Sequence, residues 1–415
     1  MNEINIEEKD AVIIGAGPAG LAAALMLKKK GIKNIVILER EKNPGGILRQ
    51  CIHDGFGLVR FKEQLSGPEY AQKFIDEILA QNISLYTGAA VTGLTKDRLV
   101  TVVTKDGLRK YQAKAVILAM GCRERTRGAL GIPGTRPAGI YTAGVAQSFI
   151  NLKNLMVGHK IVILGSGDIG LIMARRLTLE GAEVLAVIEK LPYPSGLPRN
   201  IQQCLNDYGI PLYLRHTVTD IKGRGRVENV TVSQVDDAGL PVPGTEKEYA
   251  CDTVVLSVGL IPENELTKQA GIAIDPRTNG PIVDENMHTS VDGIFAAGNV
   301  LHVHDLVDYV SWEGEKLGQA AARYITGQTL PAPLIKILPD SSIGNIVPQV
   351  ISGGQDVEIS LRVGRPWRDR AIVFKQGDAV IKKVKQKRLN PPEMVHVKLK
   401  KDSLKSGKNI MVGVE

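Results

Sequence analysis

The sequence has 415 residues, roughly two to three times the usual length of one domain, which indicates two or three packed units. Hydrophobic residues make up 43% and charged residues 23%, which excludes a disordered chain, a collagen-like repeat and a membrane bundle. The net charge of +8 belongs to the tail, because residues 1–330 hold 36 basic and 36 acidic residues whereas residues 331–415 hold 16 and 8. The tail is therefore predicted to be either a docking site for an acidic partner or a solvated lysine-rich surface.

The four cysteines lie at positions 51, 122, 204 and 251 and have no short spacing. This pattern predicts neither a disulfide framework nor a CxxC pair, and it favours a reducing, cytoplasmic setting. The first ten residues, MNEINIEEKD, lack the basic and apolar regions of an export signal, and no stretch reaches about 18 uninterrupted apolar residues. We expect no membrane span and no nucleic-acid partner.

The first predicted element is an apolar strand that leads into a glycine-rich turn and a helix, since residues 11–20 read AVIIGAGPAG. A second strand, IVILE, ends at Glu39. In such a βαβ unit the glycines allow a tight turn beside a pyrophosphate, which binds at the helix N-terminus, and the acid binds a ribose hydroxyl. The predicted dinucleotide contacts here are Gly15, Ala16, Gly17, Pro18, Ala19, Gly20, Glu39 and Arg40.

A second copy of this unit follows at a constant offset of 150 residues, since residues 161–170 read IVILGSGDIG. Glu189 repeats Glu39, 19 residues after the third glycine of its copy; a surface acid at a strand end is the alternative. The predicted contacts of this copy are Gly165, Ser166, Gly167, Asp168, Ile169, Gly170, Glu189 and Lys190. An acid at the ribose position repels a 2′-phosphate, so NAD(H) is favoured over NADP(H).

The remaining elements complete an α/β pattern. Buried strands are predicted at 115–121, 253–259 and 293–299, a helix at 307–325, and a hairpin at 230–243 with DDAG as its turn. From residue 330 prolines and alternating segments, such as 357–363 and 395–399, predict β structure. We expect two Rossmann-like dinucleotide-binding domains and a small β-rich C-terminal domain.

The chain resembles the flavoproteins of the pyridine nucleotide-disulfide oxidoreductase superfamily over residues 9–330. The matching features are GAGPAG, Gly45-Gly46, the strand end Ala119-Met120-Gly121, an inserted NAD domain and the return segment at 296–299, where Asn299 replaces the usual Asp. The resemblance implies FAD and NAD as cofactors, with an FAD domain at 1–125 and 282–330, an NAD domain at 126–281 and the basic domain at 331–415. The further cofactor contacts that it implies are Gly45, Gly46, Val91, Ala119, Gly121, Gly259, Gly298, Asn299, Leu306 and Val307.

The chain departs from the disulfide-reducing members, because it has no CxxC in the NAD domain and no CxxxxC after Gly46. It is more similar to amine, opine and cyanide-forming dehydrogenase subunits through GCRER (121–125). It is still more similar to the oxidoreductases that accompany glycerol-3-phosphate dehydrogenases in anaerobic bacteria, through the blocks at 45–61, 121–147 and 296–311. This similarity implies a partner subunit that is a glycerol-3-phosphate dehydrogenase-like flavoprotein, an iron-sulfur protein, or both.

Two side chains are candidates for chemistry at the flavin. Cys51 follows Gly46 on a segment that runs beside the flavin in this superfamily, and it is either a peroxide-reactive thiol or a small packing residue. His304 belongs to a cluster with His302, Asp305 and Asp308 just before the helix predicted at 307–325, which supplies a proton donor, or in which Asp305 caps that helix. The HxH pattern has no third ligand at zinc-like spacing, so no metal is expected.

Four arginines, at positions 123, 125, 127 and 136, crowd the passage between the two dinucleotide units. They are interpreted as hinge salt bridges or as a site for a phosphorylated ligand or an acidic partner.

The sequence thus predicts an FAD enzyme that exchanges hydride with NAD(H) and passes electrons to or from a partner redox subunit. The alternatives are a free-standing NADH peroxidase or oxidase that uses Cys51, and a structural FAD subunit with a vestigial NAD site. The tail is expected to be dispensable for binding FAD and NAD but required for the partner.

Overall fold

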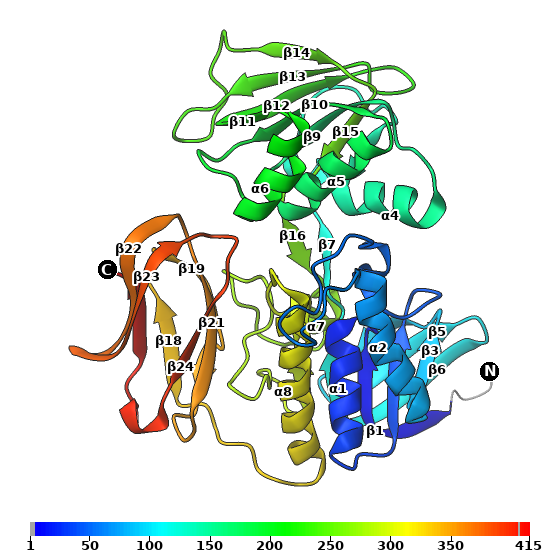
Figure 1. The fold of residues 1–415 in the computed structure, drawn as a ribbon. Helices are drawn as coiled ribbons and strands as arrows, with labels where there is room; N and C mark the ends of the chain where they lie inside the picture. Colours follow the sequence, from blue (N-terminus) through cyan, green and yellow to red (C-terminus); the bar gives the residue numbers. More distant parts are fainter. Residues whose placement is uncertain (1–4, 406) are drawn as a thin grey trace. The chain divides into compact units, whose positions relative to one another are not determined.

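The structure is a computed structural model that describes residues 5–405 and 407–415. It divides into two compact units, which are coloured along the chain in Figure 1. Unit 1 comprises Met1–Cys122 and Pro262–Glu415, and unit 2 comprises Arg123–Ile261. None of the described helices is both long and apolar enough to cross a membrane.

Unit 1 contains a mostly parallel sheet in the order β3-β2-β1-β6-β5-β4, with β17 paired to β6. Its strands are β1 (Ile6–Ile14), β2 (Ile35–Glu39), β3 (Ser84–Thr87), β4 (Ala90–Leu94), β5 (Leu99–Thr104), β6 (Gly107–Leu118) and β17 (Ile294–Ala296). Strand β5 runs antiparallel to both of its neighbours, β4 and β6. The second half of β1 and all of β2 are buried, as expected for strands of a parallel sheet that is covered on both faces.

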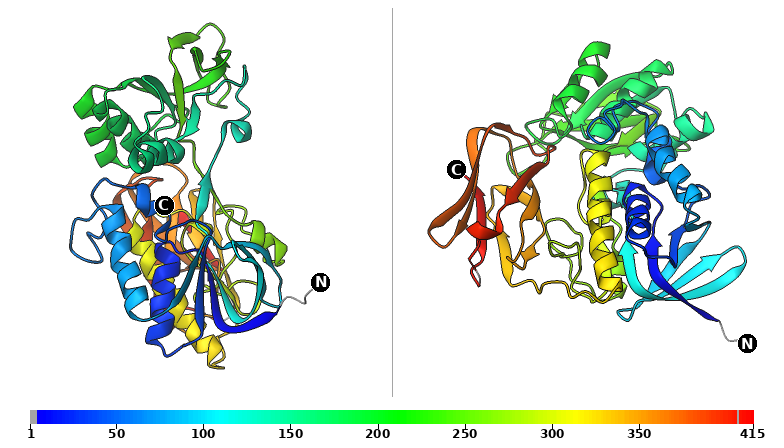
Figure 2. Two further views of the ribbon diagram at one scale, coloured as in Figure 1. Left: turned by 90° about the vertical axis from the view of Figure 1, so that its right-hand side faces the viewer. Right: turned by 60° about the horizontal axis from the view of Figure 1, so that its bottom comes forward.

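Helices α1, α2 and α8 lie side by side against this sheet (Figures 1 and 2). They span Pro18–Lys29, Gly67–Ala80 and Val307–Ile325, and three short elements accompany them, namely η1 (Gly46–Gln50), α7 (Glu265–Gln269) and η3 (Gly298–Val300). The helix predicted at 307–325 therefore has the bounds of α8. Small residues allow α1 and α8 to approach closely, because a Cβ atom on Gly314 would collide with the carbonyl oxygen of Ala19.

Unit 2 repeats the arrangement with a parallel sheet in the order β11-β10-β9-β15-β8. Its strands are β8 (Ile140–Thr142), β9 (Lys160–Leu164), β10 (Glu183–Glu189), β11 (Leu212–Leu214) and β15 (Thr253–Leu256). Its helices are α3 (Arg127–Leu130), α4 (Ala143–Lys153), α5 (Asp168–Leu179), α6 (Pro198–Cys204) and η2 (Asn206–Tyr208). The chain passes between the units through β7 (Cys122–Glu124) and β16 (Leu260–Pro262).

The hairpin predicted at 230–243 is only partly right. Strand β13 (Asn229–Gln234) pairs on one side with β12 (His216–Lys222) and on the other with β14 (Lys247–Ala250). The DDAG turn is present, since Gly239 N–H donates to Asp236 O, but it lies inside a longer connection. The segment after the turn makes an isolated bridge, Val235 to Pro241, before the chain reaches β14.

The C-terminal part of unit 1 is β-rich, as predicted. One sheet has the order β20-β18-β25-β22-β23 and the other β19-β21-β24. The elements are β18 (Ile335–Pro339), β19 (Ile343–Val347), β20 (Val350–Ile351), β21 (Val357–Val363), β22 (Trp367–Gln376), β23 (Ala379–Leu389), β24 (Val395–Leu399), η4 (Lys401–Ser403) and β25 (Ile410–Val414). Residues of both sheets form one buried cluster, so this part has a core of its own.

The first unit boundary falls after Cys122 rather than after residue 125, and larger differences from the predicted domain boundaries occur in two further places. The chain returns to unit 1 at Pro262 rather than after residue 281. The reason is the buried Asn264, whose Nδ2 donates to the carbonyl oxygens of Asn279 and Val300, both at 2.9 Å, and so ties this segment to η3 of unit 1.

The second difference concerns residues 331–415, which group with unit 1. Arg277 donates to the carbonyl oxygens of Pro339 and Asp340, at 3.0 and 3.1 Å. The buried carboxylate of Glu285 accepts the backbone N–H of Ser352 at 3.0 Å. The basic β-rich domain is therefore tied to the rest of unit 1 by polar contacts, one of them to a buried carboxylate.

Candidate functional site

The glycine-rich turn of unit 1 lies at the carboxyl edge of the sheet, where β1 and β6 end together. The N–H of Ala119 donates to the carbonyl oxygen of Ile14 at 2.9 Å. Gly15 has a φ of 107°, and a Cβ atom there would collide with the carbonyl oxygen of Ala119. Glycine is therefore required at position 15 for both its conformation and its packing.

The N-terminus of α1 is open to a ligand. The residue at the N-cap, Gly17, provides no side-chain cap, and the first turn contains no acidic residue. A Cβ atom on Gly17 would meet no described protein atom within 4 Å, so there is space in front of this turn. The Gly45-Gly46 pair lies against the same turn, since the N–H of Gly45 donates to Ala16 O at 2.8 Å. An uncapped helix N-terminus with space in front of it suits the pyrophosphate of a dinucleotide.

Glu39 and Glu189 occupy equivalent places in the two units and accept equivalent backbone hydrogen bonds, while Glu189 also accepts the hydroxyls of Ser166 and Ser195. Glu39 accepts the N–H groups of Ala16 and Glu41, both at 2.9 Å. Glu189 accepts the N–H groups of Ser166 and Leu191, at 3.0 and 2.9 Å. Both carboxylates are buried. The 150-residue repeat in the sequence is thus a repeat of atomic contacts, and each acid supports its own glycine-rich turn.

The turn in unit 2 has the same backbone requirement and one added acid. Gly165 has a φ of 96°, and a Cβ atom there would collide with Ser257 O. Asp168 stands in the first turn of α5, where its carboxylate accepts the N–H of Leu197 at 2.8 Å and the amide of Asn200 at 2.6 Å. Asp168 therefore fastens the following loop to the turn.

The return segment after β17 forms the third wall of the unit 1 site. Gly298 has a φ of 76°, and its Cβ would lie 2.9 Å from that of Ala19 on α1. The N-cap residue of α8, Leu306, provides no side-chain cap. The prediction that Asp305 caps α8 is wrong, because its carboxylate accepts the N–H of Met394 at 3.1 Å and lies 3.7 Å from Arg362. The first turn of α8 instead carries the buried acid Asp308, whose carboxylate accepts the N–H of Arg60 at 2.8 Å.

The structure gives Cys51 a packing environment. Its Sγ lies 3.4 Å from Ile47 O, and a Cβ atom on Gly67, at the start of α2, would lie 2.9 Å from its Cβ. Burial raises the pKa of the Cys51 thiol to about 12. The neighbouring His53 contacts Asp54 O, and the Asp54 carboxylate contacts Gln64, so both side chains bond within their loop. A reactive thiol needs a lowered pKa, so the structure favours the packing interpretation.

Histidines 302 and 304 come together with Glu313, which the sequence analysis missed. The Nε2 atoms of His302 and His304 lie 2.9 and 3.6 Å from Glu313 Oε1. Ligand atoms of the three residues lie within 4.8 Å of one another, so the argument that HxH lacks a third partner is wrong. The signal that could have revealed Glu313 is an acid on the apolar face of the helix at 307–325.

The structure gives five other predicted cofactor residues no specific contact with the glycine-rich turns. Val91 lies in β4, half-buried, and Arg40 and Lys190 are exposed just after the strand-end glutamates. Gly121 and Gly259 have positive φ angles of 71° and 97°, and at neither would a Cβ atom meet a described protein atom closer than 3.9 Å. The structure therefore groups most of the glycine positions around the two turns and leaves these two basic side chains in solvent.

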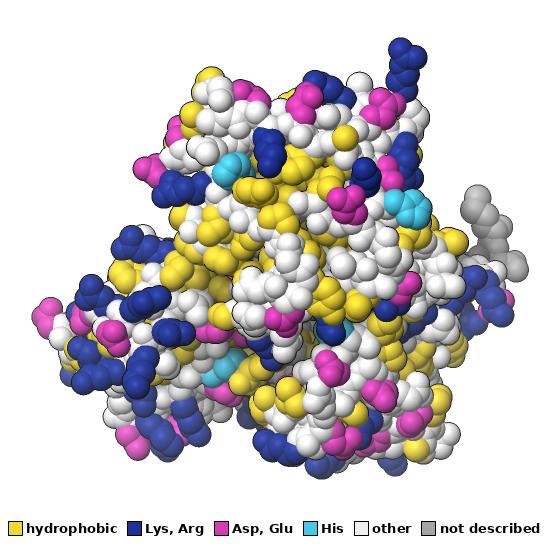
Figure 3. Space-filling model, turned by 45° about the horizontal axis from the view of Figure 1, so that its top comes forward, with side chains coloured by type: hydrophobic (Ala, Val, Ile, Leu, Met, Phe, Trp, Pro, Cys, Tyr) yellow, Lys and Arg dark blue, Asp and Glu magenta, His cyan; other side chains and the backbone are white. Residues whose placement is uncertain are grey.

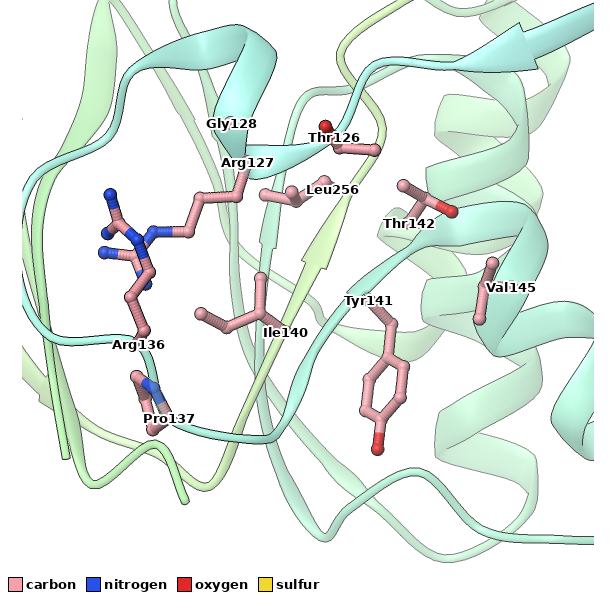
Figure 4. Close-up of a pocket in the computed structure, with 10 residues that line it drawn as sticks. All are labelled: Thr126, Arg127, Gly128, Arg136, Pro137, Ile140, Tyr141, Thr142, Val145 and Leu256. Atoms are coloured by element: carbon pink, nitrogen blue, oxygen red, sulfur yellow. The ribbon is translucent and has the colours of Figure 1, made fainter. Parts of the chain in front are cut away.

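A pocket of about 410 Å³ lies beside the edge strand β8 in unit 2 (Figure 4). Arg127 and Arg136 reach one side of it, and Tyr141, Thr142 and Leu256 line it as well. Arg127 is buried, and its guanidinium donates to the carbonyl oxygens of residues 132, 133 and 135. It holds its own loop together, so Arg127 acts neither as a hinge salt bridge nor as a free anion site.

The family is decided by a match between residues 9–323 and the model of the pyridine nucleotide-disulphide oxidoreductases. The chain belongs to this family. It is 27% identical to NAD(P)H sulfur oxidoreductase (CoA-dependent) of Pyrococcus abyssi, over 79% of this chain and 71% of that protein. It is 26% identical to an opine oxidase subunit of Agrobacterium tumefaciens, over 70% of this chain and 61% of that protein. The crystal structure of T. acidophilum thioredoxin reductase matches with a TM-score of 0.63 and 25% identity, over 77% of this chain and 98% of that one.

The protein is therefore an FAD- and NAD(P)-dependent oxidoreductase with the two-domain fold of thioredoxin reductases and a β-rich C-terminal region. The open N-terminus of α1, the space beside Gly17 and the buried Glu39 fit FAD in unit 1. The matching turn and Glu189 fit the nicotinamide dinucleotide in unit 2. When bound, the two cofactors supply hydride transfer between nicotinamide and flavin. The turns at Gly15 and Gly165 would hold the pyrophosphates, and Glu39 and Glu189 would orient the riboses.

Proposed function

We propose that this protein exchanges hydride between NAD(H) and FAD and passes electrons to or from a second redox protein, as the flavoprotein subunit of a glycerol-3-phosphate dehydrogenase-type complex. The sequence blocks at 45–61, 121–147 and 296–311 support the type of complex. The basic C-terminal domain is the proposed docking surface for the partner.

The state of the cysteines carries this proposal. All four are thiols rather than members of a disulfide, and burial raises the pKa of both Cys204 and Cys251 to about 11. Burial also raises the pKa of Cys51, to about 12. The sequence has no CxxC for a dithiol relay. Electrons that arrive at the flavin are therefore expected to leave directly to an external centre, rather than through a dithiol relay of this chain.

The docking surface is the lysine strand, which we define as the exposed basic residues of β23, namely Lys382, Lys383, Lys385, Lys387 and Arg388. Figure 3 shows basic side chains gathered over the C-terminal domain. Strand β23 is at the edge of its sheet, and among the described strands it pairs only with β22. A dense row of positive charge at an edge suits an acidic protein partner and promotes rapid association.

The decisive experiment is an anaerobic NADH titration of the purified protein, followed by absorbance, alone and with the co-purified partner. We expect about one FAD per chain, bleaching by NADH, and electron transfer to the partner that weakens as salt rises, since the Debye length is about 8 Å at physiological ionic strength. Replacement of Lys382, Lys383 and Lys385 by Glu should abolish the transfer and leave flavin bleaching intact.

The matched control replaces Lys28, Lys29 and Lys30, at the end of α1, by Glu, which changes the charge equally at another place. Equal loss of transfer in both variants, or no loss in the lysine-strand variant, contradicts the docking proposal. A flavin that NADH does not bleach indicates a vestigial NAD site. Rapid turnover of peroxide by the isolated chain, lost in Cys51→Ser, indicates the peroxidase alternative.

A further inference from the structure

The two strand-end glutamates receive different numbers of hydrogen bonds from the chain itself. Among the described residues, Glu39 has two donors, because its Oε2 accepts the N–H of Ala16 and its Oε1 accepts the N–H of Glu41, both at 2.9 Å. A carboxylate can accept about four hydrogen bonds. Glu39 therefore keeps room for both hydroxyls of a ribose.

The chain uses the whole ordinary capacity of Glu189. Its Oε1 accepts the N–H of Leu191 at 2.9 Å, and its Oε2 accepts the N–H of Ser166 at 3.0 Å. The same Oε2 also accepts the hydroxyls of Ser166 and Ser195, the latter at 2.8 Å. These donors already match the capacity of a carboxylate. A ribose that brings two more hydroxyls can be accepted in full only if one of the present donors gives way.

The difference between the two units comes from two positions of the internal repeat. At the constant offset of 150 residues, Ser166 stands where unit 1 has Ala16, and Ser195 stands where it has Gly45. In unit 1 the N–H of Gly45 donates to Ala16 O at 2.8 Å, whereas in unit 2 the N–H of Ser195 donates to Ser166 Oγ at 2.9 Å. Unit 2 thus has two hydroxyls at its acid, and unit 1 has none at these positions.

Ser195 is the donor that can give way. The N–H groups of Ser166 and Leu191 are fixed in the backbone, and the hydroxyl of Ser166 is held by the N–H of Ser195. The Oγ of Ser195 has a second acceptor, because it lies 3.2 Å from Ser166 Oγ. Rotation of one hydroxyl therefore moves its proton from Glu189 to Ser166. The loop itself stays against the turn, since a Cβ atom on Gly196 would lie 2.7 Å from Ser166 O.

The hydroxyl of Ser195 reduces what a ribose can gain at Glu189. This carboxylate is buried, and a buried acceptor that lacks a donor costs free energy until another donor replaces it. With Ser195 present, a ribose hydroxyl replaces a hydrogen bond that the chain already makes, so little is gained. Without Ser195, the same hydroxyl would satisfy an oxygen that the chain leaves short of donors, and the ribose would bind more tightly.

We propose that Ser195 determines how readily the nicotinamide dinucleotide leaves unit 2, because its hydroxyl competes with the ribose hydroxyls for the carboxylate of Glu189. No covalent bond changes in this exchange; a hydroxyl turns from Glu189 to Ser166. A resident FAD suits Glu39, whose described contacts include no competing hydroxyl, whereas NAD(H) must leave after each hydride transfer. This inference rests on the NAD(H) exchange of the proposed function and is independent of the partner.

The first test measures the binding of ADP-ribose to the full-length, FAD-loaded protein by calorimetry. We expect Ser195→Ala to lower the Kd about tenfold and to slow the release of NADH to a similar extent. Ser195→Thr keeps the hydroxyl and should resemble the wild type, and Ser341→Ala, at an exposed position, is the matched control. A Kd in Ser195→Ala that equals or exceeds that of the wild type overturns the proposal, since a merely structural role would only weaken binding.

The second test uses 2′-phospho-ADP-ribose, which lacks the 2′-hydroxyl. Its Kd should change by less than about twofold in Ser195→Ala, and a gain equal to that of ADP-ribose overturns the proposal. If Ser195→Ala does not fold, Ser195→Cys, a weaker donor, should give a smaller gain of the same sign. A wild-type protein that binds no ADP-ribose and whose flavin NADH does not bleach contradicts the proposed function as well. Bleaching without a gain in the variant contradicts this inference alone.

Discussion

At the scale of single residues, each of the two strand-end glutamates both stabilises its glycine-rich turn and stands where a ribose would bind. Glu39 and Glu189 accept two backbone N–H groups apiece, one from the glycine-rich turn and one from the segment after the strand. A ribose that binds there must share the carboxylate with these donors. The spacing in the sequence was enough to predict both acids, but the backbone contacts depend on how the strand ends and could not be predicted.

The first prediction concerns Glu189→Gln. The amide keeps the shape of the side chain but removes the charge that strengthens its hydrogen bonds, a loss of about 1.5 kcal/mol. We expect an approximately tenfold higher Kd for NADH, measured by anaerobic flavin bleaching, and a smaller discrimination against NADPH. Glu183→Gln, on an exposed position of the same strand, is the control. A wild-type protein that prefers NADPH contradicts the assignment of Glu189.

The second prediction concerns Cys51→Ser. Burial raises the pKa of the thiol to about 12, so its loss should leave NADH-to-flavin hydride transfer within about twofold of the wild type. Rapid mixing of the protein with NADH measures this step, and iodoacetamide should label Cys51 slowly at pH 8. Loss of flavin reduction with FAD still bound would show that Cys51 takes part in the chemistry.

The histidine cluster shows where prediction from residues stops. The HxH pair was recognised, but its partner Glu313 lies nine residues after His304, in the second turn of α8, and only the fold brings its carboxylate within 3.6 Å of His304 Nε2. Asp305 looked like a helix cap by its place, yet the backbone of Met394, in the C-terminal domain, bonds to it instead. Side chains whose partners come from distant segments could not be assigned without the fold.

At the scale of elements, α1 and α8 pack closely beside the glycine-rich turn of unit 1. A Cβ atom on Gly314 would collide with Ala19 O, and one on Gly318 would lie 2.7 Å from Ala23 O. Periodicity predicted α8 with its correct bounds, because its buried face repeats with the helical period. It did not indicate that two glycines on that face meet the backbone of α1, which follows from the close approach of the helices.

The third prediction is that Gly314→Val destabilises the protein and weakens FAD binding. The added side chain must push α8 away from α1, and overpacking of this kind costs about 1–3 kcal/mol or more. Thermal unfolding and the FAD content of the purified protein measure the two effects. Gln319→Val, on an exposed position of the same helix, is the control for helix propensity. Equal stability of the two variants would show that the helices have room to separate.

At the scale of the whole molecule, the C-terminal domain supports the flavin site. Arg362 donates to the carbonyl oxygen of Val303 at 3.1 Å, and the N–H of Met394 donates to Asp305, so two segments of this domain hold the loop that carries His304. The sequence predicted a basic β-rich domain correctly. The domain was expected to be dispensable for cofactor binding, but these contacts indicate that it supports the loop before α8. Charge and composition could not predict this, because they do not reveal which surface a domain covers.

The last prediction is that a chain truncated after Leu330 retains little FAD, contrary to the dispensable tail that the sequence suggested. Truncation removes the partners of two carboxylates, Asp305 and the buried Glu285, and frees the loop before α8. Each lost hydrogen bond to a carboxylate typically costs about 1.5–3 kcal/mol, and several of them together are a large part of the stability of a domain. FAD per chain and thermal unfolding report the result.

The lysine-strand variant with Glu at 382, 383 and 385 should keep normal FAD content, since these side chains are exposed on β23, away from the loop before α8. A truncated chain with one FAD and an unchanged Tm would show that the C-terminal domain is an independent appendage and that its charge alone accounts for its role.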